Sequence, residues 1–587
     1  MAAISTNLPS EPIAENPQPS ASFPTPSNTN AHSALPLPIP PEPLLIDLFC
    51  NFVEDPAAVL IREWSSEGVV AGSWSVAEFL RDVCLFSRCI WSELSVEERG
   101  RLGREGEDVF IAVVAGGCYA FAVLVVAVYG IGGVIVPISP HVHPDEAKYF
   151  LETCNASLVC AGPRTADHIH NVKPSDIKFQ LSVSPPPHSS TKGFALLYTS
   201  GTTGPPKGVF YDRSSTTGGF LTHFPNPSRP SSQDIYLNHM PVHWAGGFMT
   251  LFSGILSKAC IEFCSEVFSP SWFLKRLVDG NWPPITSLHL PPPLLNAVAS
   301  ELEDLGDRDP DLYETVLKGI GRLEVLASGG STVTPKQRVV WRVLLGKPLS
   351  VGYGMSETFG VVAYTDYRKR GEYPLDSVGL RMPNVNMKID DNCEICIKSA
   401  VLFKKYISPH PDATNNAFDS EGFYKTGDLG RIEDDVVYLL GRASQDVIRY
   451  YLWRIYAPEV EIALSQIDDI AYAIVLGVED SGCGERVAAV VVYRQQDQKR
   501  MLILADLRGR LVKECSLEAF KLPTLLKVVG SFAEIPATEA GKPIKNKIRE
   551  LYFSEMAIES GEVNVWTSEP RDSSVGARPF DWDGLQR

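Results

Sequence analysis

A run of hydroxyl and glycine residues that ends in a lysine is the segment with the clearest chemical meaning. It lies within Tyr198–Gly208 and directly follows the apolar run Phe194–Leu197, which is typical of a buried strand. Its small members are Thr199, Ser200, Gly201, Thr202, Thr203 and Gly204. The glycines let backbone amides approach an anion, the hydroxyls add donors, and Lys207 adds a positive charge. The segment therefore predicts a phosphate-binding loop.

The composition of this segment has two other possible interpretations. A flexible surface loop is disfavoured, because so many donors directly follow a buried strand. The nucleotide-binding P-loop pattern G-x-x-x-x-G-K-[ST] does not match, because Pro206 precedes Lys207 and Gly208 follows it.

Further short segments carry side chains of the types that bind nucleotides. They are Ser328–Ser331, Gly352–Glu357, Tyr424–Asp428, Gly441-Arg442 and Ile535–Lys542. Taken alone, each has an ordinary explanation, such as a turn, a core aromatic residue or a solvated lysine. Glu357 stands out, because Mg²⁺ commonly takes one carboxylate together with nucleotide phosphates.

In this order along the chain, the segments resemble the motifs of adenylate-forming enzymes. That family includes acyl-CoA synthetases, aryl-CoA ligases, beetle luciferase and peptide-synthetase adenylation domains. The resemblance extends from about Leu45 to Tyr552, and it is nearest to malonyl-CoA-synthetase-like and medium-chain acyl-CoA ligases.

The resemblance implies a role for each motif residue. Adenine would lie against Gly329, Gly330 and Ser331, and would also be bordered by Tyr353 and Gly354. Ser356 would contact the α-phosphate, and Glu357 and Thr199 would hold Mg²⁺. Asp428 would accept hydrogen bonds from the ribose hydroxyls, Arg442 would contact ribose or phosphate, and Lys542 would be the catalytic lysine. Ser356 and Glu357 are counted with Lys542 as catalytic.

The resemblance also places an acyl pocket at Met240–Gly247. Its expected lining is His243, Trp244, Gly246, Gly247 and Met355. With Phe248, Met249 and Phe359 nearby, an apolar pocket is expected. Malonate-activating members carry an arginine just before the motif tyrosine, but this chain has Gly352 there, which disfavours a dicarboxylate.

The chain departs from the family after Gly441-Arg442. Arg449 replaces a family lysine, and Tyr451-Leu452 replace glycines in a loop that moves toward the pantetheine channel. Bulky side chains there could narrow the channel or move the backbone out of a positive φ. Adenylation is therefore expected, whereas the acceptor, CoA or a carrier-protein thiol, stays open.

The implied activity is ATP-dependent conversion of a carboxylic acid to acyl-AMP and then to acyl-CoA, in fatty-acid or secondary metabolism. ATP, Mg²⁺ and CoA are the implied cofactor and co-substrates. One rival is an acyl-AMP ligase that serves a carrier protein or another acceptor. The other rival is an inactive nucleotide-binding regulatory protein.

The composition of the chain limits the classes of binding partner and the cellular location that can be expected. With a net charge of −17, the chain is not expected to bind nucleic acid. Twelve cysteines scattered along the chain indicate reduced thiols, and no Lys or Arg precedes Arg62 to form a presequence or signal, so a cytoplasmic location is expected. Monomer and homodimer both stay open.

The elements that must position these motifs alternate between strand-length apolar runs and amphipathic helices. Strands are expected at 109–114, 133–137, 157–161 and 324–328, and helices at 144–154 and 269–278. Residues 109–138 carry no charge, and we expect a buried strand, helix and strand there, not a membrane span.

The alternation predicts an α/β fold: a large multi-sheet N-terminal adenylate-forming domain with largely parallel sheets, followed by a small mobile α+β C-terminal domain. The expected boundaries are a disordered leader at 1–43, the AMP-binding domain at 44–443, the C-terminal domain at 444–556 and a flexible tail at 557–587.

Overall fold

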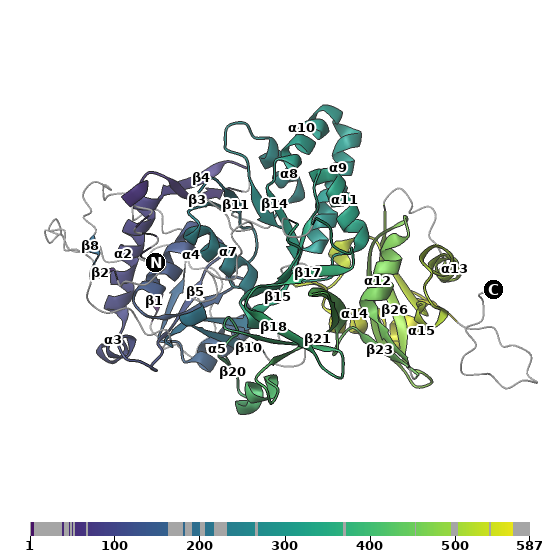
Figure 1. Ribbon diagram of the computed structural model, residues 1–587. Coiled ribbons are helices and arrows are strands. Elements are labelled where there is room, and N and C mark those ends of the chain that lie inside the picture. The colour runs from purple at the N-terminus through teal and green to yellow at the C-terminus, as the bar shows by residue number, and fades with distance from the viewer. Residues whose placement is uncertain are drawn as a thin grey trace, which may run out of the picture.

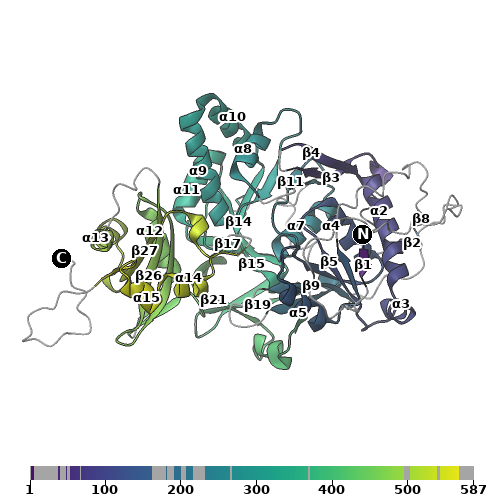
Figure 2. The ribbon, with the colours of Figure 1, turned by 180° about the vertical axis from the view of Figure 1, so that it is seen from behind.

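The computed structural model describes most of the 587 residues. The described residues are 2–4, 38–39, 46, 48, 50, 53–65, 68–161, 180–181, 191–199, 206–215, 232–264, 268–367, 371–451, 453–494, 503–538 and 542–566. Figures 1 and 2 show the C-terminal strands and helices gathered at the opposite end of the molecule from β1 and α3.

The first large sheet holds the strand that leads into the predicted phosphate loop. Its spatial order is β1 (Ala2–Ile4), β7 (Leu158–Ala161), β5 (Phe110–Val114), β6 (Val134–Ile138), β9 (Gly193–Thr199), β10 (Lys207–Asp212) and β20 (Lys405–Ile407). Strands β7, β5, β6 and β9 run parallel, and β10 returns antiparallel to β9. Thr199 and Lys207 are therefore paired across the mouth of the loop.

The second sheet is larger and only partly parallel. Its order is β18 (Val385–Ile389), β19 (Glu394–Ser399), β21 (Tyr424–Glu433), β22 (Val436–Arg442), β17 (Ser377–Arg381), β16 (Gly360–Tyr364), β15 (Ser350–Met355), β14 (Val325–Gly329), β13 (Ser287–His289), β11 (Ile235–Leu237), β12 (Cys260–Cys264), β3 (Val59–Trp64) and β4 (Val70–Ser75). Strands β3, β12, β11, β13, β14 and β15 are parallel, and the arm from β16 to β18 is antiparallel. The expectation of largely parallel sheets therefore holds for only part of this sheet.

Helices separate and cover these two sheets. Between the sheets lie α4 (Tyr119–Gly130), which packs on β5, β6 and β3, and α7 (Ala245–Leu256), which packs on β12 and β16. The helix α2 (Val76–Glu93) lies beside α4 and is followed by α3 (Val96–Leu102). The far face of the second sheet is covered by α8 (Pro270–Val278), α9 (Pro292–Arg308), α10 (Pro310–Gly321) and α11 (Pro335–Leu345), and α5 (Pro144–Cys154) covers the first sheet.

The uncharged run at residues 109–138 is buried, as expected. It forms β5, α4 and β6, and every residue from Phe121 to Tyr129 in α4 is at most 1% exposed. An all-round apolar helix of twelve residues suits a layer enclosed by two sheets.

The C-terminal part is a small α+β unit with its own core. Its sheet contains β24 (Trp453–Tyr456), β23 (Val447–Tyr450), β26 (Gly484–Tyr493), β27 (Leu525–Val529) and β28 (Asn564–Val565), and β25 (Ile470–Asp480) pairs with β26. Its helices are α12 (Ala457–Gln466), α13 (Leu504–Cys515), α14 (Lys545–Tyr552) and α15 (Glu555–Glu559). Its two apolar clusters contain only residues from 448 onward, whereas the other clusters end at 439.

Both ends differ from the expected leader and tail. Residues 557–566 were expected in the flexible tail, but α15 and β28 pack against the small domain, and Arg486 donates to the Trp566 carbonyl at 2.9 Å. Within the expected disordered leader, β1 pairs with β7, and β2 (Pro38–Ile39) pairs with β8 (Gln180–Leu181). An open strand edge offers unpaired backbone groups, so such pairing needs no apolar core.

Candidate active site

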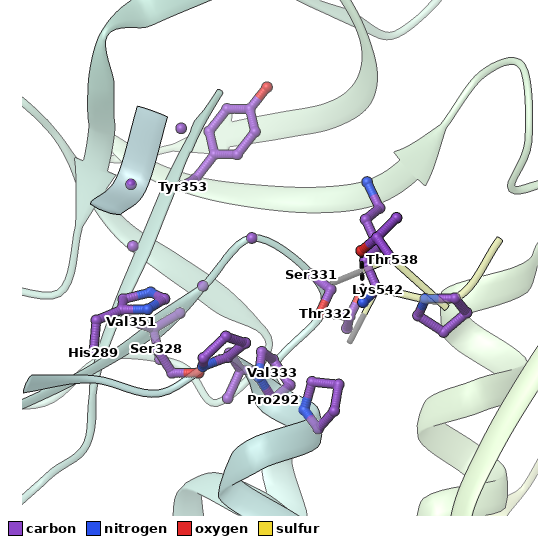
Figure 3. A pocket seen from close by; sticks show the side chains of 18 of the residues that line it. His289, Pro292, Ser328, Ser331, Thr332, Val333, Val351, Tyr353, Thr538 and Lys542 are labelled. Atoms are coloured by element: carbon purple, nitrogen blue, oxygen red, sulfur yellow. Dashed lines mark hydrogen bonds between the residues drawn. The ribbon is translucent and has the colours of Figure 1, made fainter. Parts of the chain in front are cut away.

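A cleft of about 1730 Å³ lies between the two parts of the chain. It opens where β14 and β15 end, and the C-terminal part closes it from the other side with Thr538 and Lys542. Figure 3 shows these two residues facing the loop that carries Ser331 and Thr332. Its volume exceeds that of an ordinary ligand pocket, so a nucleotide and a second group could occupy it together.

Glycine shapes the turn after β14. A Cβ on Gly329 would lie 2.4 Å from the Gly352 carbonyl oxygen of the neighbouring strand. Gly330 has a φ of +81°, which a residue with a side chain rarely adopts. The turn can therefore take this path only with glycine at both positions, and Ser331 then lines the cleft.

The end of β15 places three of the expected residues on the cleft. Tyr353 is 6% exposed, and Ser356 and Glu357 follow it in the short helix η4 (Ser356–Thr358). A Cβ on Gly354 would lie 2.0 Å from the Gly360 carbonyl oxygen, so the β-bulge at this position depends on glycine.

Asp428 is held by two of the other predicted nucleotide-binding residues. The Tyr353 hydroxyl donates to Asp428 Oδ2 at 2.8 Å, and Arg442 Nε donates to Asp428 Oδ1 at 2.7 Å. The antiparallel pairing of β21 with β22 sets Asp428 directly opposite Arg442. Burial opposes the charged form of Arg442, but its hydrogen bond and ion pair with Asp428 raise its pKa. The carboxylate is thus fixed in one orientation beside the cleft.

Glu357 has a partner that the sequence analysis missed. Tyr406 donates its hydroxyl to Glu357 Oε1 at 2.8 Å and lies 3.3 Å from the Tyr424 hydroxyl. Lys207 Nζ lies 5.3 Å from the centre of the Tyr406 ring, so the lysine of the predicted phosphate loop approaches the same tyrosine. Burial, followed by the charge of Glu357, raises the pKa of Tyr406 far above its usual range, so this tyrosine acts as a neutral donor.

Replacement of Tyr406 with phenylalanine tests this arrangement. We expect Tyr406→Phe to raise the Mg²⁺ concentration for half-maximal activity several-fold, because a bond to a charged group contributes about 1.5–3 kcal/mol. The measurement is pyrophosphate release against Mg²⁺ concentration, with Tyr313→Phe on α10 as the matched control. An unchanged Mg²⁺ dependence would show that Tyr406 does not orient Glu357.

Lys542 approaches the cleft from the C-terminal part. Its backbone N–H donates to Thr538 Oγ1 at 3.2 Å, and its carbonyl accepts from the Thr538 N–H at 2.8 Å. The side chain of Lys542 is exposed to the open space of the cleft, and the walls of the cleft surround it on most sides. Loss of surrounding water, and then the nearby charge of Arg442, lowers the pKa of Lys542, while Asp428 and Asp446 act in the opposite direction.

Asp446 joins the two parts beside this lysine. Its Oδ2 accepts the Arg442 N–H at 2.9 Å, and its Oδ1 accepts from Lys545 Nζ at 2.5 Å. Lys545 also donates to Glu461 Oε1 at 3.3 Å and to the Val475 carbonyl at 2.8 Å. This half-buried ion cluster ties the start of α14, three residues after Lys542, to the backbone of Arg442.

The expected acyl pocket is only partly as predicted. His243, Trp244, Gly246 and Met355 line the cleft, but Gly247 does not. A Cβ on Gly247 would lie 2.4 Å from the Pro241 carbonyl oxygen, so this glycine serves close packing. Phe248 and Phe359 are also absent from the lining, because both pack in the core against Phe194.

The predicted phosphate loop is described only at its two ends. Thr199 and Lys207 both line the cleft, Thr199 Oγ1 donates to the Lys207 carbonyl at 3.3 Å, and Tyr149 donates to the Pro206 carbonyl at 2.9 Å. The remaining members Ser200, Gly201, Thr202, Thr203 and Gly204 lie outside the described residues.

The cleft, its glycine turns and the two-part architecture define a nucleotide-binding enzyme of the adenylate-forming class. Residues 99–407 match the model of the AMP-binding enzyme family, and residues 459–542 match the AMP-binding enzyme C-terminal domain. The chain therefore belongs to the family of AMP-binding enzymes.

Known proteins agree with this assignment. The chain is 27% identical to malonate–CoA ligase of Arabidopsis thaliana, over 75% of this chain and 77% of that one, and 25% identical to acyl-CoA ligase oryP of Aspergillus oryzae, over 76% and 82%. The fold matches ATP-bound MatB of Rhodopseudomonas palustris with a TM-score of 0.70 at 21% identity, covering 87% of this chain and 99% of that one. The expected family and fold are confirmed, and the relatives support the expected class of enzyme, an ATP-dependent acid–CoA ligase.

Location is less well defined than family. None of the helices in the described ranges has the length and apolarity needed to cross a bilayer. A bovine relative, 24% identical over 80% of this chain and 84% of its own, is named as mitochondrial. The cytoplasmic location therefore stays a prediction, as do the alternatives of monomer and homodimer.

Proposed function

We propose that this protein joins a carboxylic acid to AMP at the cleft and then transfers the acyl group to CoA. The observation that supports this function is the convergence of Tyr353, Glu357, Asp428, Arg442 and Lys542 on one cleft from two parts of the chain. These residues supply a ribose-binding carboxylate, an acidic metal ligand and two cations, which together suit a nucleoside triphosphate.

In the first step the substrate carboxylate attacks the α-phosphorus of ATP, and pyrophosphate leaves. Lys542 balances the negative charge that grows on the phosphoryl oxygens, and Ser356 contributes a hydroxyl. Glu357 would hold Mg²⁺, which neutralises phosphate charge. Tyr406 bonds Oε1 of Glu357, so Oε2 would be the oxygen that holds the ion. In the second step the CoA thiol attacks the acyl carbonyl and AMP leaves.

The two steps place different demands on the C-terminal part. With Lys542 beside Arg442, the present arrangement suits adenylate formation. We propose that the C-terminal part rotates about Ser444–Asp446 before the thiol arrives, as in a hinge motion.

Isotope exchange decides between this function and its rivals. Labelled pyrophosphate should enter ATP only when a carboxylic acid is present, and AMP should appear in stoichiometric amounts once CoA is added. Exchange without CoA-dependent AMP release would identify an enzyme that serves another acceptor. No exchange with any acid would leave an inactive nucleotide-binding protein.

The altered loop near Tyr451 keeps the backbone of a glycine turn. Strands β23 and β24 pair as a hairpin, and Tyr451 at its turn has a φ of +52°. The expectation that a bulky residue would move this backbone out of a positive φ is therefore wrong for Tyr451. A non-glycine residue with a left-handed backbone costs about 1–2 kcal/mol. The Tyr451 side chain is 41% exposed, and its ring contacts that of Tyr450.

We expect Tyr451→Gly to lower the KM for CoA and to leave acid-dependent pyrophosphate release unchanged. The ring would no longer occupy the space that the thiol arm needs after rotation, and glycine accepts the left-handed backbone without strain. The measurement is steady-state kinetics at varied CoA, with a thermal melt of each variant.

The matched control for this change is Ser516→Gly, which also removes a side chain from a left-handed residue of the same domain, with a φ of +54°. Both variants should melt at the same or a higher temperature, but only Tyr451→Gly should alter the KM for CoA. An equal KM in all three proteins would mean that Tyr451 does not border the CoA path.

A further inference from the structure

One chamber of the cleft has a mixed character that the sequence did not predict. The helix α7 presents Gly246, Met249, Thr250 and Ser253 to it, at spacings of three and four residues. The opposite side of α7, with Phe248 and Phe252, packs in the core against Phe194. The helix thus divides its apolar side chains between core and chamber, and it adds two hydroxyl groups to the chamber.

The sheet that faces α7 adds three more polar side chains. Residues paired across neighbouring strands share a face, and so do residues two apart along a strand. Tyr236 pairs with Ser287, which lies two residues before His289. His289 pairs with Ala327, two residues before Gly329, and Gly329 pairs with Gly352, which also pairs with Tyr364. Tyr236, His289 and Tyr364 therefore lie on one face of the sheet. All three line the cleft.

Three of these polar groups lie close together, and a fourth lacks a partner. Thr250 Oγ1 donates to the Gly246 carbonyl at 2.8 Å and lies within hydrogen-bonding reach of Tyr236. Tyr364 is near enough to Tyr236 to contribute to its raised pKa of about 12, whose main cause is burial. His289 Nδ1 is buried and has no hydrogen-bond partner among the described residues, and Figure 3 shows His289 in the wall of the cleft.

Among the residues that the structure describes, the elements that form this chamber contribute no positive charge to it. The cations of the described cleft lining are Lys207, Lys336, Arg431, Arg442, Arg494, Lys542 and Lys545, and none belongs to α7 or to β11, β13, β14, β15 or β16. Burial, followed by the neighbouring His239, lowers the pKa of His289 to about 4, so the imidazole is neutral at physiological pH. A second carboxylate in the chamber would be desolvated without a counter-charge, which is costly.

We infer that the acyl substrate is an uncharged chain with a hydroxyl group at the end away from its carboxylate. The apolar stem would lie along Met240, Trp244, Met249 and Met355, and the hydroxyl would bond within the group Tyr236, Thr250, Ser253, His289 and Tyr364. This inference rests on the proposed function. Buried polar groups reject a ligand that cannot pair with them, so the chamber selects for the hydroxyl and against both alkyl and carboxylate ends.

Three matched series of acids test the inference: ω-hydroxy acids, plain alkanoic acids and dicarboxylic acids over the same chain lengths. The readout is kcat/KM for acid-dependent pyrophosphate release. At the best chain length we expect the hydroxy acid to exceed both counterparts about 10-fold or more, because an unpaired buried polar group costs about 1–3 kcal/mol. An alkanoic or dicarboxylic acid as the best substrate would overturn the inference.

A variant separates recognition from general damage. Tyr236→Phe removes one hydroxyl and keeps the ring, so it should lower kcat/KM for the hydroxy acid about 10-fold and leave the alkanoic acid nearly unchanged. Tyr313→Phe on α10 is the control and should change neither. Equal losses for both acids would assign Tyr236 a structural role and overturn the inference, whereas the absence of pyrophosphate release with every acid would refute the proposed function itself.

Discussion

Lys542→Ala will lower acid-dependent pyrophosphate release about 100- to 1000-fold and leave the CoA-dependent use of synthetic acyl-AMP nearly unchanged. Loss of one group that stabilises transition-state charge typically has an effect of that size. The selectivity for one step follows from the proposed rotation of the C-terminal part, which would carry Lys542 away from Arg442 and from the cleft that it lines here. Single-turnover assays started from acid and ATP, or from acyl-AMP and CoA, measure the two steps separately.

The matched control is Lys547→Ala, which removes an exposed lysine from the same end of the chain, on α14. It should leave both steps intact. If Lys542→Ala slowed both steps equally, Lys542 would be a structural residue or one needed in both arrangements, and its assignment to adenylate formation would fail.

Asp428→Ala will weaken the binding of ATP and AMP about 100-fold. Hydrogen bonds to a charged group contribute about 1.5–3 kcal/mol each, and two ribose hydroxyls would lose their acceptor. Isothermal titration with AMP measures the effect directly and needs no acid substrate. Asp412→Ala, an exposed carboxylate in the same large domain, is the control and should bind AMP normally.

Asp428 accepts hydrogen bonds from Tyr353 and Arg442 even without nucleotide, so Asp428→Ala also changes the free protein. Removing it leaves a nearly buried hydroxyl and a guanidinium without their acceptor, which lowers stability. Tyr353→Phe loses the same hydroxyl bond but keeps the carboxylate. If Asp428→Ala bound AMP as tightly as Tyr353→Phe, the ribose role would be refuted.

The parts of the fold that could be predicted from sequence are those with local signals. The helix at Pro144–Cys154 is found where expected, because a proline and two acidic residues mark its start and Asn155 ends it in the left-handed region. The joining of the antiparallel arm from β16 to β18 was not predicted, because the pair β17–β22 that connects its hairpins brings together Ser377 and Tyr438, which are far apart in the chain. Pairing partners at such distances leave no periodicity in a local window.

The site shows the same division. Glu357 and Asp428 could be predicted from the sequence to lie at the cleft, as they do, because each lies in a short motif of unusual composition. Tyr406 could not, because its strand of three residues resembles any core segment; only the pairing of β10 with β20 brings it between Lys207 and Glu357. Phe248 and Phe359 were assigned to the pocket by proximity in sequence, but the rotational setting of α7 and the left-handed backbone of Phe359 turn them into the core.

The separate apolar clusters on the two sides of residue 440 have a consequence for heat denaturation. Each part has an apolar core of its own, so we expect the two parts of the free chain to unfold in separate transitions and not at a single melting temperature. With Asp428 on one side and Lys542 on the other contacting the nucleotide, as proposed above, ATP is expected to bind most tightly when both parts are folded. We therefore expect saturation with ATP to merge two calorimetric unfolding transitions into one. Such merging would indicate that the cleft closes on ATP, and the measurement needs no catalytic turnover.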